Sequence, residues 1–468
     1  MEDRVVTQGR FAGLERWPVS YTQALLSFIE AQWPGGGLGP RYTMSVTETL
    51  EGSFSHSALE RALETILARH DVLRTALVFE ADGPCQVVVP LGELPLTHTD
   101  LTRVPASERR GAVARVIGEL GMQPVPVDSP PLIRFDHLSV GDGEEILVTT
   151  AHHCAYDFWS ARLFGYELSN LYQAFSTGQE ASLPPLPVQY VDFAMWQREL
   201  METDAAEANL RYWGDQLRDL PATRLPLDHP RPETPSGVGR HVALQVPDGL
   251  ARQLREVAAA EGASPFMLLM AVFTAVLASV TGQEDVAVPT WFTGRTRPEL
   301  EGLIGNFDDV LLVRTTIRPE QTLRATIGAI RETMLTAYER QVPIVRIIET
   351  RPDLLALLAT PDNVWIAFHR QAVPRPLEKA ARRVREHVGD AGGPVGCVLP
   401  TGEDYEEFFA GADLDVRIRE GSSGLFVEAM YSPDLFERAT IESLMLRYGA
   451  ALSQVPSALD EPVGNLTD

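Results

Sequence analysis

Two adjacent histidines followed by an aspartate form the group in this sequence best suited to chemistry. His153 directly follows His152, and Asp157 lies four residues after His153, which gives the spacing His-x-x-x-Asp. A neutral imidazole accepts a proton from an amine or a hydroxyl, and its near-neutral pKa suits it to general-base catalysis. We therefore predict that His153 is the general base or positions the nucleophile. Asp157 either orients the histidine or, as we favour, pairs with an arginine and holds the loop.

The same segment is compatible with other roles. Two histidines after a buried strand are often satisfied core residues, and an isolated His-x-x-x-Asp match favours that simpler interpretation. Adjacent histidines rarely ligate one ion and no third ligand is near, so we expect no metal. The Gly-x-Ser-x-Gly motif of serine hydrolases does not occur. Cys154 lies beside His153, but a cysteine between a strand and a helix is more often an inert apolar group.

The neighbouring segments predict how the histidines are positioned. Residues 145–150 are apolar and β-branched, which predicts a strand that delivers the chain into His152. A helix is expected over 160–175. Upstream, the pattern of apolar residues predicts an amphipathic helix over 57–70 that begins with a capping box, Ser57-x-x-Glu60. Two β-rich runs within 75–89, separated by a turn signal, predict a hairpin and hence a mixed α/β lobe.

A proline-rich stretch, 183–187, cannot continue the helix before it, and we place a lobe boundary there. The predicted domains are 1–177, which carries the His-x-x-x-Asp group, and 178–468. The second is also expected to be α/β, from the following pattern: helices over 250–261 and 266–280, and strands over 285–289 and 310–316.

Composition narrows the partners and the compartment. Apolar residues make up 44% of the 468 residues, which predicts a globular protein, and the net charge of -24 disfavours nucleic acid and anionic membranes. The longest apolar run, 266–280, is shorter than the roughly 18 residues of a spanning helix. Cys85, Cys154 and Cys397 match neither a zinc site nor a disulfide framework. We therefore expect a cytoplasmic protein.

The chain resembles the condensation domains of nonribosomal peptide synthetases along nearly its whole length. His152 to Phe158 is similar to the active-site motif of that family, HHxxxDG. Further similar segments follow in the family's order: Pro18 to Gln23, Arg69 to Thr75, Tyr190 to Gln197, Tyr212 to Pro232, Gly294-Arg295, Ile304 to Phe307, Gln341 to Pro343 and Tyr431 to Phe436.

This resemblance implies a fold and a set of site residues. The fold would be α/β, two lobes like chloramphenicol acetyltransferase subunits arranged as a V, with the active site in a tunnel between them. His153 would be catalytic, His152 structural, and Asp157 would pair with Arg295 of the second lobe. The three residues after Asp157, which are Phe158, Trp159 and Ser160, are expected to contact substrate.

The resemblance also implies the partners. The donor would be an acyl thioester on the phosphopantetheine arm of an acyl or peptidyl carrier protein, and the acceptor a small amine or alcohol. No cofactor would be bound by this chain. Because neither an adenylation motif nor a carrier motif follows Phe436, we expect a free-standing enzyme.

Phe158 departs from the family pattern, which has glycine at this position, and Asp308-Asp309 replaces a more usual Val-Asn pair. The aromatic ring could narrow the tunnel, select an unusual acceptor, or accompany loss of activity. Two alternatives therefore stay open: an inactive member that recruits a tailoring enzyme, and a coenzyme-A-dependent HxxxD acyltransferase. The DFGWG-like motif of the plant-type coenzyme A enzymes is absent.

Overall fold

The computed structural model describes residues 11–32, 35–39, 42–50, 54–80, 83–233, 235–358, 360–370, 407–408, 412–421 and 424–467. The chain divides into two compact units. Unit 1 contains the described residues up to Leu200 and also Thr293–Asp308, and unit 2 contains the remaining described residues. Both units combine helices with sheets, as predicted.

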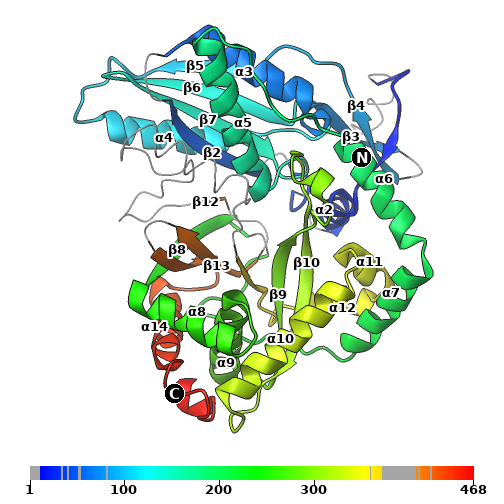
Figure 1. The fold of residues 1–468 in the computed structure, drawn as a ribbon, viewed down its shortest axis with the longest axis vertical. Helices are drawn as coiled ribbons and strands as arrows, with labels where there is room; N and C mark the ends of the chain where they lie inside the picture. The colour runs from blue at the N-terminus through cyan, green and yellow to red at the C-terminus, as the bar shows by residue number, and fades with distance from the viewer. Residues whose placement is uncertain are drawn as a thin grey trace. The chain divides into compact units, whose positions relative to one another are not determined.

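A four-stranded sheet in the order β2-β7-β6-β5 is the centre of unit 1 (Figure 1). Its strands are β2 (Thr43–Leu50), β5 (Leu96–Asp100), β6 (Ile133–Gly141) and β7 (Glu144–His152). β7 pairs antiparallel with β2 and β6, whereas β5 runs parallel to β6. Because successive side chains of a strand point to opposite faces, each face needs its own cover.

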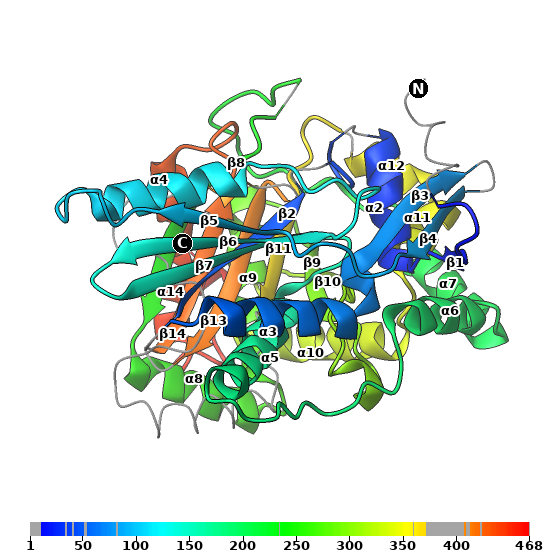
Figure 2. The ribbon, with the colours of Figure 1, turned by 90° about the horizontal axis from the view of Figure 1, so that it is seen from above.

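Helices supply that cover on both faces. α3 (His56–Arg69) and α5 (Phe158–Ser176) lie side by side (Figure 2) and bury apolar residues of one face. α4 (Arg109–Gly121) packs on the other face. The remaining elements of unit 1 are β1 (Trp17–Pro18), α2 (Tyr21–Gln32), η2 (Asp71–Arg74), β3 (Thr75–Glu80), β4 (Gly83–Val88), η3 (Pro298–Leu300) and most of α6 (Tyr190–Met201).

The hairpin predicted within 75–89 is confirmed, since β3 and β4 pair antiparallel. The helix predicted over 57–70 is present, but its predicted capping box is wrong. Ser55 is the N-cap and its hydroxyl accepts from the amide of Ala58, which places Ser57 inside the first turn. Two serines two residues apart offer the same capping chemistry, so the sequence pattern did not separate them.

Unit 2 is built around a five-stranded sheet in the order β11-β13-β14-β8-β12 and a two-stranded sheet of β9 and β10. Its strands are β8 (Val238–Val246), β9 (Asp285–Thr293), β10 (Asp308–Thr316), β11 (Ile366–Arg370), β12 (Glu407–Phe408), β13 (Leu414–Gly421) and β14 (Gly424–Tyr431). Its helices are α7 (Asp204–Gln216), α8 (Asp248–Ala260), α9 (Pro265–Thr281), α10 (Leu323–Glu339), α11 (Ile344–Thr350), α12 (Pro352–Leu358), α14 (Arg438–Gln454) and α15 (Gly464–Thr467).

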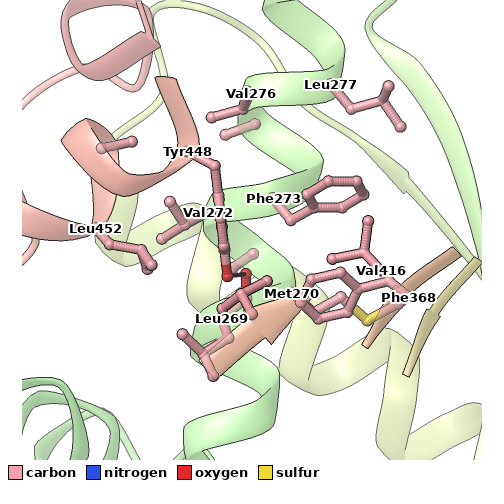
Figure 3. Packing of buried hydrophobic residues seen from close by; sticks show 14 of the residues in the cluster. Leu269, Met270, Val272, Phe273, Val276, Leu277, Phe368, Val416, Tyr448 and Leu452 are labelled. Carbon is pink, nitrogen blue, oxygen red and sulfur yellow. Dashed lines mark hydrogen bonds between the residues drawn. The ribbon is translucent and has the colours of Figure 1, made fainter. Parts of the chain in front are cut away.

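α9 is the central helix of unit 2, and most of its residues are buried. Figure 3 shows Phe273 of this helix stacked on Phe368, with ring centroids 4.8 Å apart, and edge-on to Tyr448. The buried Tyr448 hydroxyl donates to the carbonyl of Leu269 at 3.0 Å. α9 is buried because it carries apolar side chains on every face, and removing each of them from water stabilises the fold.

The division into units differs from the predicted boundary after residue 177. Unit 1 continues to Leu200 because Tyr190 and Phe193 of α6 pack into its hydrophobic cluster. Leu183 and Leu186 of the proline-rich stretch also pack against that cluster. α5 ends at Ser176, before the prolines, and Gly178 follows in the left-handed region with φ +71°. The packing of Leu183 and Leu186 keeps the chain on unit 1.

Among the described residues, no single helix is long and apolar enough to cross a membrane. α8 and α9 together have the length and composition of a span, but they are bent by 100° at their junction.

Candidate active site

The loop between β7 and α5 carries the predicted site residues. β7 ends at His152, and Asp157 is the N-cap of α5, with its Oδ1 accepting from the amide of Ser160 at 2.7 Å. An aspartate is among the best N-caps because its carboxylate satisfies an amide that has no partner within the helix. The loop is therefore fixed at both ends, and His153 lies between them.

His153 is held with one ring nitrogen directed at the protein. Its Nδ1 lies 2.6 Å from the carbonyl oxygen of Tyr156. A carbonyl oxygen only accepts, so Nδ1 carries the proton and Nε2 has the lone pair. No described residue hydrogen-bonds to Nε2, and the ring is partly exposed. This is the tautomer that a general base requires.

Burial lowers the pKa of His153, although the Tyr156 carbonyl and the Asp157 charge act in the opposite direction. The imidazole is therefore neutral at neutral pH. Its ring stacks on Tyr42, with centroids 5.2 Å apart, and its amide donates to the Tyr42 carbonyl at 2.9 Å. Burial, with a smaller effect of Asp308, raises the pKa of Tyr42 to about 12, so the stacking partner is also neutral.

His152 has no exposed surface and uses both ring nitrogens within unit 1. Its Nε2 donates to the carbonyl of Gly39 at 3.1 Å, and its Nδ1 accepts from the amide of Cys154 at 3.1 Å. Burial lowers its pKa to about 4. This environment suits the structural role expected for His152.

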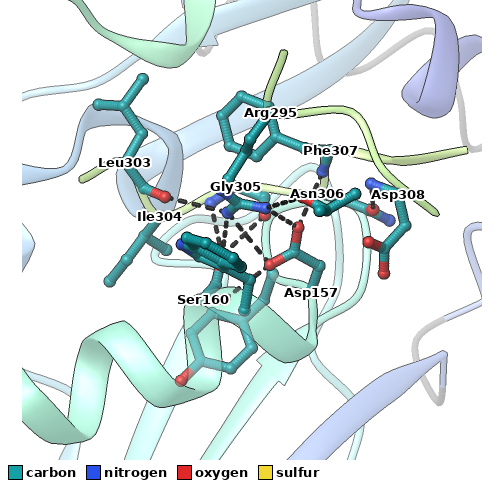
Figure 4. A network of polar contacts seen from close by, with 12 residues as sticks. Asp157, Ser160, Arg295, Leu303, Ile304, Gly305, Asn306, Phe307 and Asp308 are labelled. Atoms are coloured by element: carbon teal, nitrogen blue, oxygen red, sulfur yellow. Dashed lines mark hydrogen bonds and ion pairs between the residues drawn. The ribbon is translucent and has the colours of Figure 1, made fainter. Parts of the chain in front are cut away.

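Asp157 and Arg295 form a buried ion pair (Figure 4). Nη1 of Arg295 lies 2.5 Å from Oδ2 and Nη2 lies 3.2 Å from Oδ1, with side-chain exposures of 1% and 0%. The pairing implied by the family resemblance is thus present. The expectation that Arg295 belongs to the second lobe is wrong, because the segment Thr293–Asp308 belongs to unit 1.

Further contacts stabilise the two terminal nitrogens of this guanidinium, whereas its Nε has no partner among the described residues. Nη2 of Arg295 donates to Ser160 Oγ and to the carbonyl of Leu303, both at 3.1 Å. Its guanidinium carbon lies 4.1 Å from the ring centroid of Phe307, whose amide donates to Oδ2 of Asp157. Two charges taken out of water are tolerated only with such additional hydrogen bonds.

Asn306 links the same segment to the histidine, and sequence reasoning did not assign it a role. Its Nδ2 donates to the carbonyl of His153 at 2.6 Å, and its Oδ1 accepts from the amide of Asp308. The only signal was its place in the segment Ile304 to Phe307, one of those similar to the family. Asn306 therefore positions the backbone of the predicted base.

Glycine is required at two points of this segment because of close approach. A Cβ on Gly305 would lie 2.3 Å from the ring of Tyr190, and one on Gly294 would lie 2.5 Å from the carbonyl oxygen of Phe307. The Tyr190 hydroxyl donates to the carbonyl of Asn306 at 2.5 Å. The segment Thr293–Asp308 therefore packs closely against Tyr190 of α6 within unit 1.

His70 is a second supporting residue whose role sequence reasoning missed. Its Nδ1 accepts from the amide of Ile304 at 3.2 Å, and its Nε2 lies 2.9 Å from Glu167 of α5. Glu167 also binds Arg69. The Arg69 to Thr75 segment therefore connects α3 and α5 to the segment that carries Arg295.

The three residues predicted to contact substrate have different surroundings. Ser160 is buried, donates its hydroxyl proton to the carbonyl of Gly305, and accepts from the Gly305 amide and from Arg295. This hydroxyl already makes all the hydrogen bonds it can, one donated and two accepted. We therefore replace its predicted substrate contact with a structural role. Trp159 is partly exposed and donates to the carbonyl of Glu301. Phe158 is partly exposed below the guanidinium of Arg162.

Other candidate chemistry receives no support from the geometry. Burial raises the pKa of the Cys154 thiol, which has no exposed surface, so a nucleophilic thiolate is disfavoured. Within the part of the chain that the structure describes, no three His, Cys, Asp or Glu side chains are arranged to hold a metal ion. Cys397 lies outside the described residues.

Comparisons with known proteins give one consistent family. The model of the condensation domain matches residues 37–352. Chondramide synthase cmdD from Chondromyces crocatus is 32% identical over 94% of this chain, and phosphinothricin tripeptide synthetase PhsC from Streptomyces viridochromogenes is 36% identical over 71%. The matched regions are only 11% and 30% of those two relatives.

Solved structures share the fold. The SgcC5 protein from Streptomyces globisporus, 25% identical, matches 95% of this chain and 100% of its own with a TM-score of 0.77. The X-domain from teicoplanin biosynthesis matches 96% of this chain at 23% identity with a TM-score of 0.75.

We predict that Asp157→Ala destabilises the protein by about 3 to 5 kcal/mol, because it leaves a buried guanidinium without its counter-charge and removes the N-cap of α5. Chemical denaturation monitored by fluorescence measures this. Asp192→Ala is the control, since that exposed carboxylate accepts only the amide of Gln189 near the start of α6. Equal stability losses in the two variants would contradict the prediction.

Proposed function

This chain belongs to the condensation-domain family, and on that premise we propose that it is a free-standing condensation enzyme of natural-product biosynthesis. Condensation domains act in nonribosomal peptide synthesis as acyl-transferring enzymes on carrier-bound substrates. The specific reaction proposed here joins an acyl thioester on a carrier protein to a small amine or alcohol, with formation of an amide or an ester.

The observation that carries this proposal is the tautomer of His153. Its Nδ1–H donates a hydrogen bond to the Tyr156 carbonyl, and its Nε2 has a lone pair and no protein partner among the described residues. Because burial lowers its pKa, the ring is ready to accept a proton at neutral pH.

The proposed step uses that lone pair directly. Nε2 of His153 removes the proton from the acceptor nitrogen or oxygen as this atom attacks the thioester carbonyl carbon. The new C–N or C–O bond forms, the C–S bond breaks, and the proton passes from Nε2 to the departing thiolate. No covalent enzyme intermediate is needed, in keeping with the buried Cys154 thiol and the fully bonded Ser160 hydroxyl.

Partners and compartment are part of the same proposal. The chain would bind no cofactor of its own, because the phosphopantetheine arm of the carrier brings the donor. Cys85 and Cys154 are free thiols, which fits a reducing cytoplasm. That the enzyme is free-standing is part of the proposal, and this chain matches 100% of the solved SgcC5 chain. That structure contains a naphthyl-substituted ethanediol, which supports an aromatic alcohol as one acceptor to test.

One experiment separates this proposal from its two alternatives. The purified protein is incubated with an acyl-carrier donor or an acyl-coenzyme A donor and a panel of amines and alcohols, and products are identified by mass spectrometry. Product from the carrier donor alone supports the proposal. Product from coenzyme A alone overturns the donor assignment, and no product with either donor favours an inactive recruitment domain.

We predict that His153→Ala folds but loses roughly 100-fold or more in kcat, because the proton acceptor is removed. Turnover is measured under saturating donor and acceptor, and folding by thermal denaturation. His152→Ala is the adjacent control and should lower the melting temperature, since its ring bonds Gly39 and Cys154. A His153→Ala variant within about threefold of wild type would remove His153 as the base.

The pH profile gives an independent prediction. The neutral imidazole is the active form, and burial lowers its pKa from 6.5, so kcat/KM should fall on acidification only below pH 6.5. An alcohol acceptor is used because it does not itself titrate in this range. An acidic limb centred above pH 6.5 would contradict the environment described for His153.

Phe158 is proposed to shape the acceptor site. Its ring is partly exposed at the first residue of α5 and does not belong to the hydrophobic cluster of unit 1. Phe158→Gly should therefore broaden or shift the ranking of amine and alcohol acceptors in kcat/KM, while donor-carrier recognition is unchanged. Phe175→Gly, which changes the other α5 phenylalanine lying below an arginine, is the control. Unchanged ranking in Phe158→Gly would refute this role.

A further inference from the structure

Three buried polar side chains in unit 1 have no hydrogen-bond partner. The atoms concerned are Oε1 of Glu48, Oγ1 of Thr149 and the hydroxyl oxygen of Tyr156, and none of the described residues bonds to them. The three residues are exposed by only 7%, 1% and 0%. Buried polar groups in folded proteins nearly always have a partner, and the usual partner where protein supplies none is water.

Two of the three residues, Glu48 and Thr149, are neighbours on the sheet. Glu48 lies opposite Leu147 in the register of β2 and β7, and Thr149 lies opposite Val46, so Glu48 and Thr149 are diagonal neighbours on one face. Residues in this relation are close enough for a water molecule to bridge their side chains.

Aromatic packing brings Tyr156 to the same face. Its ring meets Phe164 edge-on at 6.5 Å, and Phe164 stacks on Phe135, which is paired with Thr149 in the register of β6 and β7. Tyr156 is also close enough to Glu48 for the carboxylate to raise the pKa of the phenol, after the larger effect of burial.

We propose that an ordered internal water molecule binds between Glu48, Thr149 and Tyr156. A water molecule offers two donors and two acceptors, and two hydroxyls with a carboxylic acid can satisfy both kinds. The site holds the Tyr156 ring inside unit 1 while the Tyr156 carbonyl accepts the hydrogen bond from His153 Nδ1–H. The water thus anchors the loop that fixes the histidine tautomer.

The charge state of Glu48 follows from its surroundings. Burial alone raises its pKa to about 7, and no neighbouring charge opposes this. The buried face of α3 is apolar, and Glu167, the charged group on the buried face of α5, is bound by Arg69 and His70. The strand register also places His98, Asp100, His137 and Glu145 on this side of the sheet. The loop between β7 and α5 adds the titratable groups of His153, Cys154 and Asp157. Glu48 is therefore protonated below pH 7 and donates a hydrogen bond.

Tyr156→Phe tests whether a water molecule hydrogen-bonds to the Tyr156 hydroxyl. If water satisfies the hydroxyl, the variant loses a made hydrogen bond and the melting temperature falls by about 2 °C. If the hydroxyl is dry and unpaired, its removal raises the melting temperature, which overturns the proposal, as does no change. Tyr448→Phe is the matched control, because that buried hydroxyl demonstrably donates to Leu269 and the variant should lose stability.

Glu48→Gln tests the protonated carboxyl. The pKa of Glu48 is 4.5 in the unfolded chain and about 7 in the folded protein. The contribution of the protonated carboxyl to folding stability is therefore complete below pH 4.5. It is lost as the pH rises to 7, because the unfolded state gives up this proton before the folded state does. The melting temperature of wild type minus that of Glu48→Gln should fall from pH 5 to 7 and then level. A difference independent of pH overturns the proposal, as does a crystal structure without water between the three side chains. Neither test uses turnover, so failure here is separate from failure of the acyltransferase assignment.

Discussion

The buried ion pair between Asp157 and Arg295 is the interaction on which the rest of the site depends. The carboxylate caps α5, accepts from the Phe307 amide and neutralises the guanidinium, all without exposure to water. An ion pair in this environment is stable only while every partner is in place. The loop that carries His153, the first turn of α5 and the segment Thr293–Asp308 are therefore fixed together.

The segment Thr293–Asp308 shows how unit 1 obtains part of its candidate active site from a distant part of the chain. Residues 293–308 join two strands of unit 2, yet they pack in unit 1. Gly305 allows the chain to approach the Tyr190 ring, and the His70 ring accepts the Ile304 amide. Asn306 then bonds the backbone of His153. Support for the histidine comes from several elements and not from its own loop alone.

Burial decides the chemistry of the two adjacent histidines in different ways. Both are neutral because desolvation penalises the imidazolium. His152 has partners on both nitrogens and is left with a structural role, whereas His153 has a partner on Nδ1 only. The difference between a packing residue and a proposed base is thus one lone pair, on Nε2 of the partly exposed His153, that has no partner among the described residues.

The sequence by itself determined the local elements and indicated the histidine that we propose as the base. Periodicity placed α3, α5, α9 and the strand before His152, because the spacing of apolar residues is a local property. The His-x-x-x-Asp spacing indicated the base, and the family resemblance supplied the partner of Asp157. Only the tertiary structure assigned Arg295 to unit 1, directed Ser160 inward and buried Oε1 of Glu48 without a hydrogen bond from any described residue. These features depend on which distant segments pack together and on how much water they exclude, and no local pattern of residues records either.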